Sequence, residues 1–146
     1  MPADFLPALA FSAALFFTAL TIGAMAYFGA GVAPVVFRVL DEKKAGTVVR
    51  AMFPVYYIVL FVLSALAAAS AFAINPTAGL VLAVVAGGFV FARQVMMPRI
   101  NQLRDQMNQG SQAAKGSFDM MHAWSVRMNM IQLIILFIVF WFIALS

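Results

Sequence analysis

The 146-residue chain has no cysteine, one histidine and few charged residues. Without cysteine it has no disulfides, no thiolate metal ligands and no cysteine nucleophile. Charged residues make up only 10% of the chain, whereas a soluble domain of this length needs several dozen of them on its surface. A zinc site takes three or four nitrogen, sulfur or carboxylate ligands, and one histidine with scattered acids does not supply them. These scarcities exclude a water-soluble fold and leave no basis for a zinc site.

Apolar residues, in contrast, make up 65% of the chain and occur in long runs. A helix needs about 20 apolar residues to cross a bilayer core of about 30 Å. Four runs meet this requirement, so we predict an all-α polytopic membrane protein, an antiparallel bundle of four transmembrane helices forming a single domain. The predicted spans cover about residues 8–37, 53–74, 78–97 and 122–145.

The first apolar run is longer than one bilayer crossing requires, so its helix must tilt, bend or extend past the membrane. We expect a bend near Gly29, Gly31 and Pro34, because proline removes a backbone hydrogen bond and small residues let a neighbouring helix approach. The short stretch Asn75–Thr77 cannot cross a bilayer, so the third span must return antiparallel to the second.

The basic residues predict the orientation in the membrane. They all flank the first polar connection, Arg38–Arg50, or the third, after Pro98. Cytoplasmic loops carry an excess of Lys and Arg, so both connections are predicted in the cytoplasm and both termini outside it, in a bacterial inner membrane. The formal charge of +4 comes from these connections between apolar runs, and the sequence indicates no basic face that would bind nucleic acid. The lipid bilayer is therefore the expected partner.

Polar residues in the fourth span recur on one side of the predicted helix. At 100° per residue, His122, Ser125, Asn129 and Gln132 fall within a stripe about 80° wide. Polar groups at membrane depth are costly unless they face the bundle interior or a water-filled cavity, so the stripe should point inward. An interhelical hydrogen-bond seam and a ligand or ion site explain it equally well.

The segment after Pro98 is the expected partner of this stripe. Asn101, Arg104, Asp105 and Asn108 recur there at helical spacing, and proline is acceptable in the first turn of a helix. Arg104 and Asp105 are predicted to pair with each other or across the bundle, while Asn108 equally fits a solvated loop. Tyr56 and Tyr57, at the cytoplasmic end of the second span, are expected to anchor the helix at the interface.

His122 is the one imidazole of the chain, the side-chain type suited to proton transfer and metal ligation, and most of the methionines lie near it in the sequence. Thioethers bind Cu(I), and methionine with histidine can ligate haem iron, but methionine is more often a flexible apolar filler. Ser125 near His122 lacks both an orienting acid and the glycines of a nucleophile elbow, which argues against a hydrolase. The methionines near His122 in the sequence are Met96, Met97, Met107, Met120, Met121, Met128 and Met130.

Four motifs in order resemble the transmembrane protein 205-like family, a domain of unknown function. They are GAGVAPVVFR from Gly29, FPVYY from Phe53, MPRINQLRD from Met97 and FDMMHAWSVRMN from Phe118. The resemblance implies a four-helix membrane protein and no established biochemistry. A fainter similarity links the chain to small haem-binding membrane proteins of protoporphyrinogen oxidation and to copper-resistance membrane proteins, which carry a histidine early in the first helix; this chain has none there.

We therefore predict a non-enzymatic protein, either a permeation element or an accessory membrane subunit, with a polar site on the cytoplasmic side and no metal or cofactor. A homo-oligomer or a partner in a membrane complex is expected, because one small bundle encloses little volume. The alternatives are a haem- or copper-binding oxidoreductase centred on His122 and nearby methionines, and a structural scaffold. The predicted polar site consists of Arg38, Tyr57, Asn101, Arg104, Asp105, His122, Ser125 and Asn129.

Overall fold

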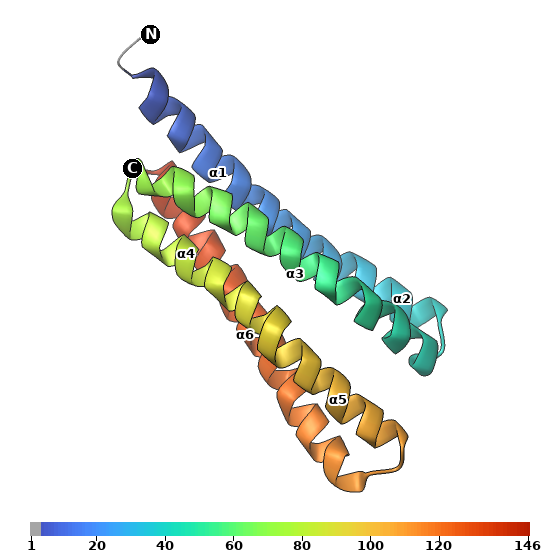
Figure 1. The fold of residues 1–146 in the computed structure, drawn as a ribbon. Coiled ribbons are helices and arrows are strands. Elements are labelled where there is room, and N and C mark those ends of the chain that lie inside the picture. Colours follow the sequence, from blue (N-terminus) through green and yellow to red (C-terminus); the bar gives the residue numbers. More distant parts are fainter. Residues whose placement is uncertain (1–3) are drawn as a thin grey trace.

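The computed structural model describes residues 4–146, and all regular structure in that range is helical. Four continuous helical stretches, Phe5–Val39, Glu42–Phe72, Pro76–Asn108 and Gln112–Ala144, are long and apolar enough to cross a membrane. They run antiparallel in the order of the chain (Figure 1). The predicted all-α membrane architecture with four helices is confirmed, while the positions at which each helix enters and leaves the bilayer stay predictions.

Two of the four stretches are interrupted by π-helical turns. The first consists of α1 (Phe5–Ala26), the turn η1 (Tyr27–Val32) and α2 (Ala33–Val39); the third consists of α4 (Pro76–Phe91), the turn η2 (Ala92–Met96) and α5 (Met97–Asn108). The second and fourth stretches are the single helices α3 (Glu42–Phe72) and α6 (Gln112–Ala144).

Each π-helical turn ends two residues before a proline. Pro34 lies in the first turn of α2 and Pro98 in the first turn of α5. Proline has no N–H group, so a carbonyl one turn earlier loses its α-helical donor and the backbone adjusts locally. A π-helical turn that includes Gly29 and Gly31 lies in the region where a bend is predicted, and the third stretch has a similar turn, although the sequence shows no internal repeat. The protein thus consists of two similarly built helical hairpins.

The turns that connect the helices are short and capped by side chains. Asp41, Asn75 and Ser111 each accept a hydrogen bond from the backbone N–H three residues later, which satisfies a donor at the start of the next helix. A hydrogen bond and ion pair with Lys44 hold the pKa of Asp41 below its usual range. Gly110 has a φ of 94°, which glycine adopts without strain.

The first polar connection is much shorter than the sequence suggested. Arg38–Arg50 was expected to be a connection between spans, but Arg38 belongs to α2, and α3 already begins at Glu42. The cause is the cap at Asp41, which lets the helix start before the apolar run does. The polar residues of this segment therefore have the fixed positions of a helix.

Small residues pack the end of the bundle at the α3–α4 turn. Ala67, Ala71, Ala78 and Gly79 are buried there, and side chains of this size let α3 and α4 approach closely. The largest fully buried side chains continue this core toward the middle of the bundle. They are Leu60, Leu82, Phe89, Leu136 and Ile143.

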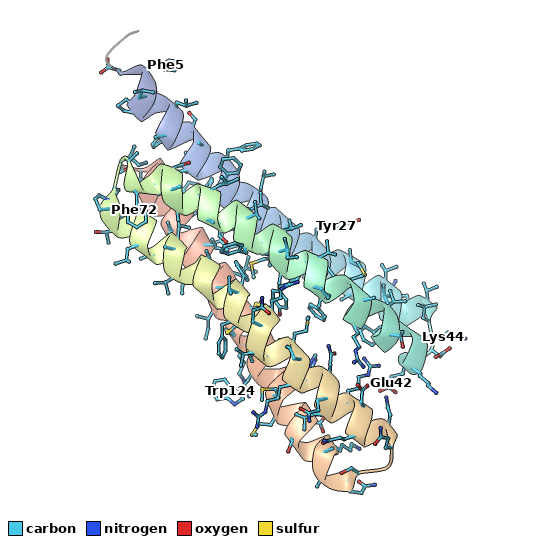
Figure 2. All side chains as sticks on the ribbon, in the orientation of Figure 1. Phe5, Tyr27, Glu42, Lys44, Phe72 and Trp124 are labelled. Atoms are coloured by element: carbon cyan, nitrogen blue, oxygen red, sulfur yellow. The ribbon has the colours of Figure 1, made fainter. Side chains whose placement is uncertain are left out.

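Large apolar side chains also cover the outside of all four stretches. Tyr27 and Trp124 project away from the bundle (Figure 2), with exposed fractions of 73% and 56%. An apolar exterior of this extent is stable in lipid and not in water, so the protein is an integral membrane protein that contacts the bilayer.

Toward the other end, the two hairpins diverge (Figure 1). Among the described residues, α2 packs mainly against α3 and η1, and α5 packs mainly against α6 and η2. The helices of different hairpins are therefore held together chiefly by the half of the bundle near the α3–α4 turn. The half near the α2–α3 and α5–α6 turns is open to a cavity.

Candidate functional site

A cavity of about 510 Å³ lies between the two hairpins. The first hairpin supplies walls from α1, η1, α2 and α3, and the second supplies walls from α5 and α6. The cavity extends from Glu42 and Met107, near the turns, to Met25 and Leu133 deeper in the bundle. Its volume is within the range of small-molecule sites, which are mostly apolar with a few placed polar groups.

Six of the eight residues of the predicted polar site line this cavity, and two do not. Arg38 is exposed on α2 outside the cavity, and Asp105 lies beside it, bound to the cavity-lining Arg50. Those that line the cavity are Tyr57, Asn101, Arg104, His122, Ser125 and Asn129.

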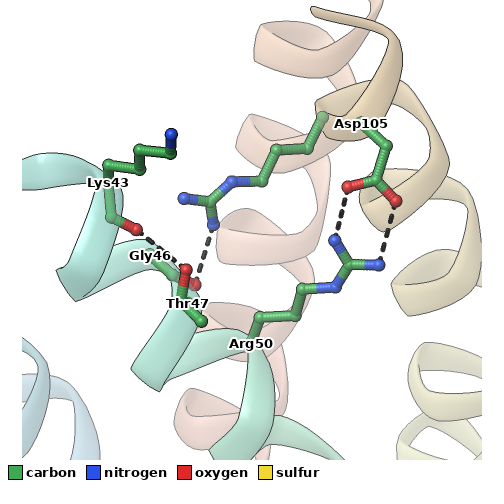
Figure 3. A network of polar contacts seen from close by, with 6 residues as sticks. Lys43, Gly46, Thr47, Arg50 and Asp105 are labelled. Carbon is green, nitrogen blue, oxygen red and sulfur yellow. Dashed lines mark hydrogen bonds and ion pairs between the residues drawn. The ribbon is translucent and has the colours of Figure 1, made fainter. Parts of the chain in front are cut away.

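Two arginines connect the hairpins across the opening (Figure 3). The Arg50 guanidinium on α3 donates two hydrogen bonds to the Asp105 carboxylate on α5, at 2.6 and 3.0 Å. Arg104 on α5 donates from Nη1 to the carbonyl oxygen of Gly46 on α3 at 2.8 Å. Of the two pairings expected for Asp105, the one across the bundle is the one formed, and it is bidentate, the strongest arrangement for these groups.

Gly46 leaves the space in which the Arg104 guanidinium lies. A Cβ atom at this position would overlap the guanidinium group of Arg104. Gly46 is buried in the second turn of α3, a place where glycine otherwise costs helix stability. The close approach thus explains a residue that helix propensity alone disfavours.

Sequence reasoning missed Arg50 and Gly46 as parts of this site. In the sequence, Arg50 is one of the charges that predict the orientation, and Gly46 lies in the predicted first polar connection. The available signal was the short distance of both from the predicted start of the second helix, since residues one turn apart share a face. Without knowing that this face meets α5, their partners could not be named.

Tyr57 faces the interior of the bundle. Its side chain is 4% exposed, and its hydroxyl oxygen accepts a hydrogen bond from Asn129 Nδ2 at 3.2 Å. The expected anchoring at the membrane interface is therefore wrong for Tyr57, because this position of α3 is buried in the bundle, facing Phe89 of α4 and Asn129 of α6. The Oδ1 atom of Asn129 is buried and has no partner among the described residues.

The stripe on α6 divides into two parts. Gln132 is buried deeper than the cavity and donates from Nε2 to the Val85 carbonyl oxygen of α4 at 3.1 Å, as an interhelical seam requires. His122 is exposed toward the cavity and stacks on Phe118, with ring centroids 5.8 Å apart. The Ser125 hydroxyl donates to the backbone carbonyl of His122 at 2.9 Å. The interhelical seam and the cavity-facing surface thus occupy different turns of one helix.

Aromatic rings from η1 and α3 form one wall of the cavity. Phe28 of η1 stacks on Tyr56 of α3 with ring centroids 4.4 Å apart, and Phe53 contacts both rings. Tyr57 stacks on Phe53 at 5.6 Å. Such a cluster gives the cavity a rigid apolar surface, because stacked rings have few alternative rotamers.

Metal-ligating side chains are sparse in residues 4–146, where no three His, Cys, Asp or Glu side chains lie together. The cavity does bring His122 into one lining with four methionines far apart in the sequence. These are Met25, Met97, Met107 and Met130.

The chain matches one protein-family model over more than half of its length. The model of a domain of unknown function, DUF4149, matches residues 16–109. The chain belongs to the DUF4149 family. No curated protein and no solved structure matches it. The DUF4149 match includes the aromatic wall and both interhairpin arginine contacts, whereas α6 with His122 and Asn129 lies beyond it.

Proposed function

We propose that this DUF4149 protein is a non-enzymatic membrane protein that holds a small solute in the cavity between its hairpins. It acts either as a permeation element or as an accessory subunit of a membrane complex. The observation that carries this proposal is the cavity itself, with mostly apolar walls and with Arg104, Asn101 and His122 placed around it. Concave sites of this composition are the usual binding sites of small molecules.

The basic residues near the α2–α3 and α5–α6 turns support an orientation with these turns in the cytoplasm of a bacterial cell and the termini on the other side. The cavity would then be reached from the cytoplasmic side of the inner membrane. A pathway across the whole bilayer would need a second copy or a partner, because the half near the α3–α4 turn is filled by buried side chains.

Permeation is tested by the flux of potassium, chloride and phosphate from proteoliposomes. A flux above that of protein-free liposomes should fall in Ala33→Phe, because Ala33 lines the cavity and a phenyl ring there would fill part of it. The matched control is Ala30→Phe, one turn earlier on an exposed position outside the cavity. If none of the three ions passes and the protein is a strict monomer by native mass spectrometry, the accessory role is retained and permeation is rejected.

We also propose that the transmembrane protein 205-like proteins are relatives of this chain, because four motifs that resemble theirs occur in order. These motifs begin at Gly29, Phe53, Met97 and Phe118. The motif around Phe53–Tyr57 supports this, because it supplies most of the aromatic wall of the cavity. The test is an alignment of this chain with those proteins. If Arg50 varies independently of Asp105, and Gly46 independently of Arg104, the two groups of proteins do not share this site.

A second candidate, a haem- or copper-binding protein, is favoured by one observation. His122 and four methionines line the same cavity, and imidazole with thioether ligands suits Cu(I) and haem iron. The test is an absorption spectrum and metal analysis of the protein purified in detergent. A Soret band or one equivalent of copper that is lost in His122→Ala would replace the first candidate with this one.

A further inference from the structure

The charges around the cavity are not equivalent. Arg50 shares its guanidinium with the Asp105 carboxylate through two hydrogen bonds. Arg104 donates one hydrogen bond to a backbone carbonyl and lies within 4.0 Å of no carboxylate in residues 4–146. Glu42, the one acid in the cavity lining, is exposed at the first turn of α3 and forms no ion pair in this range. Among the arginines that line the cavity, Arg104 is therefore the one that forms no ion pair within residues 4–146.

The guanidinium of Arg104 is also held in position. Its Nη1 atom is bound to the Gly46 carbonyl, and the missing Cβ of Gly46 makes room for the group. An arginine has five N–H donors in a rigid fork, so most of them remain for another partner. Carboxylates and phosphates match that fork, which makes a bound oxyanion the expected neighbour.

The rest of the cavity would not suit a free inorganic anion. Phe28, Phe53 and Tyr56 form its rigid apolar wall, and Phe118 and Met107 add to the apolar lining from α6 and α5. A small hydrated anion would leave this surface in contact with water, whereas an apolar chain or ring system would cover it. Arg104 and the aromatic wall line the same cavity, so a molecule with one anionic end and one apolar end would fit both.

We propose that the ligand of this cavity is an amphiphile with a single oxyanion head, carboxylate or phosphate, bound by Arg104, and an apolar body lying against the aromatic wall. This inference rests on the proposed function, since it names the class of solute that the cavity holds. Asn101 and His122, which line the cavity from α5 and α6, supply further hydrogen-bonding groups for the head.

The test measures binding of radiolabelled laurate, dodecyl phosphate and dodecanol to the full chain in phosphatidylcholine nanodiscs, with empty nanodiscs subtracted. Laurate or dodecyl phosphate should bind at least tenfold more tightly than dodecanol. Arg104→Gln should remove this preference, because it weakens the binding of the two anionic probes. The matched control, Arg99→Gln, removes an exposed arginine of the same helix that lies outside the cavity, and it should keep the preference.

Gly46→Ala is the second variant, because it displaces the guanidinium without removing the charge. Alanine is the better helix former, so the protein should fold, and the preference for the anionic probes should fall as it does in Arg104→Gln. A preference that survives both variants overturns the role of Arg104.

The remaining outcomes separate this inference from the proposed function. Equal binding of all three probes, blocked by Ala33→Phe, would overturn the oxyanion head while keeping the cavity as a solute site. Binding of none of them would overturn the amphiphile, and the proposed function would then be decided by the ion flux and its response to Ala33→Phe. Inorganic phosphate that competes with laurate at equal concentration would overturn the amphiphile and assign Arg104 to a soluble anion. Preference for laurate over dodecyl phosphate, or the reverse, identifies which oxyanion source the site takes.

Discussion

The two ends of the bundle use different residues and have different properties. At the α3–α4 turn, small side chains such as Ala71 and Gly79 bring helices into close contact, and no ion pair is found there within residues 4–146. At the α2–α3 and α5–α6 turns, π-helical turns and prolines come before a stretch in which aromatic rings, methionines and long arginines occupy the space. Close packing of small residues makes the first end rigid, whereas the second end leaves room for a ligand.

The largest effect is expected from filling the packed end. A Cβ atom at Gly79 would lie 2.9 Å from the backbone Cα of Phe72, so Gly79→Ala must separate α3 and α4. We expect a loss of about 1–3 kcal/mol, the usual cost of overpacking, in SDS unfolding titrations followed by circular dichroism. Gly87→Ala is the control, since nothing lies within 4 Å of its Cβ position and its stability should not fall. Equal losses in both variants would mean that the contact is not what requires glycine.

The cap of the packed end should matter next. Asn75 accepts a hydrogen bond from the Ala78 N–H at 3.0 Å and begins α4. Asn75→Ala should cost about 1 kcal/mol in the same titration, and Asn75→Ser should restore most of it, because serine caps helices nearly as well. An alanine variant as stable as the wild type would show that Pro76 and the surrounding packing define the helix start without the cap.

A smaller effect is expected at the boundary between the two ends. Gln132 donates one hydrogen bond to the Val85 carbonyl, but its own Oε1 is buried without a partner in the described residues. Gln132→Met loses the bond and the unpaired acceptor together, so stability should change by less than about 1 kcal/mol in either direction. A loss of more than about 2 kcal/mol would mean that the amide aligns α6 and α4.

The smallest change in stability is expected at the open end, where a distance is the better measurement. Asp105→Asn removes the ion pair with Arg50. The Asp105 side chain is 48% exposed and the Arg50 side chain 39%, and ion pairs this exposed add little to the free energy of unfolding. The distance between spin labels at Lys43→Cys and Gln109→Cys should nevertheless broaden. The cysteine-free chain makes such labelling specific. Arg50→Asp combined with Asp105→Arg should narrow the distribution again, and an unchanged distribution in Asp105→Asn would mean that packing alone positions the hairpins.

Much of the site could be expected from the sequence, because helical periodicity is a local property. His122, Ser125, Asn129 and Gln132 share one face at any helix packing, and their polarity requires that this face points inward. The periodicity does not say which helix they meet. For that reason the sequence could not separate Gln132, which binds α4, from His122, which lines the cavity.

By itself, the sequence determined that this is a membrane protein of four helices, that its polar groups gather at one end, and that its first helix is irregular near Pro34. Hydropathy, charge position and proline chemistry act within one segment, so they need no knowledge of the neighbours. Only the tertiary structure decided that Arg50 pairs with Asp105, that Gly46 makes room for Arg104, and that Tyr57 turns inward. Each of these depends on which faces of separate helices meet, and that is set by the close packing of small residues at the far end of the bundle.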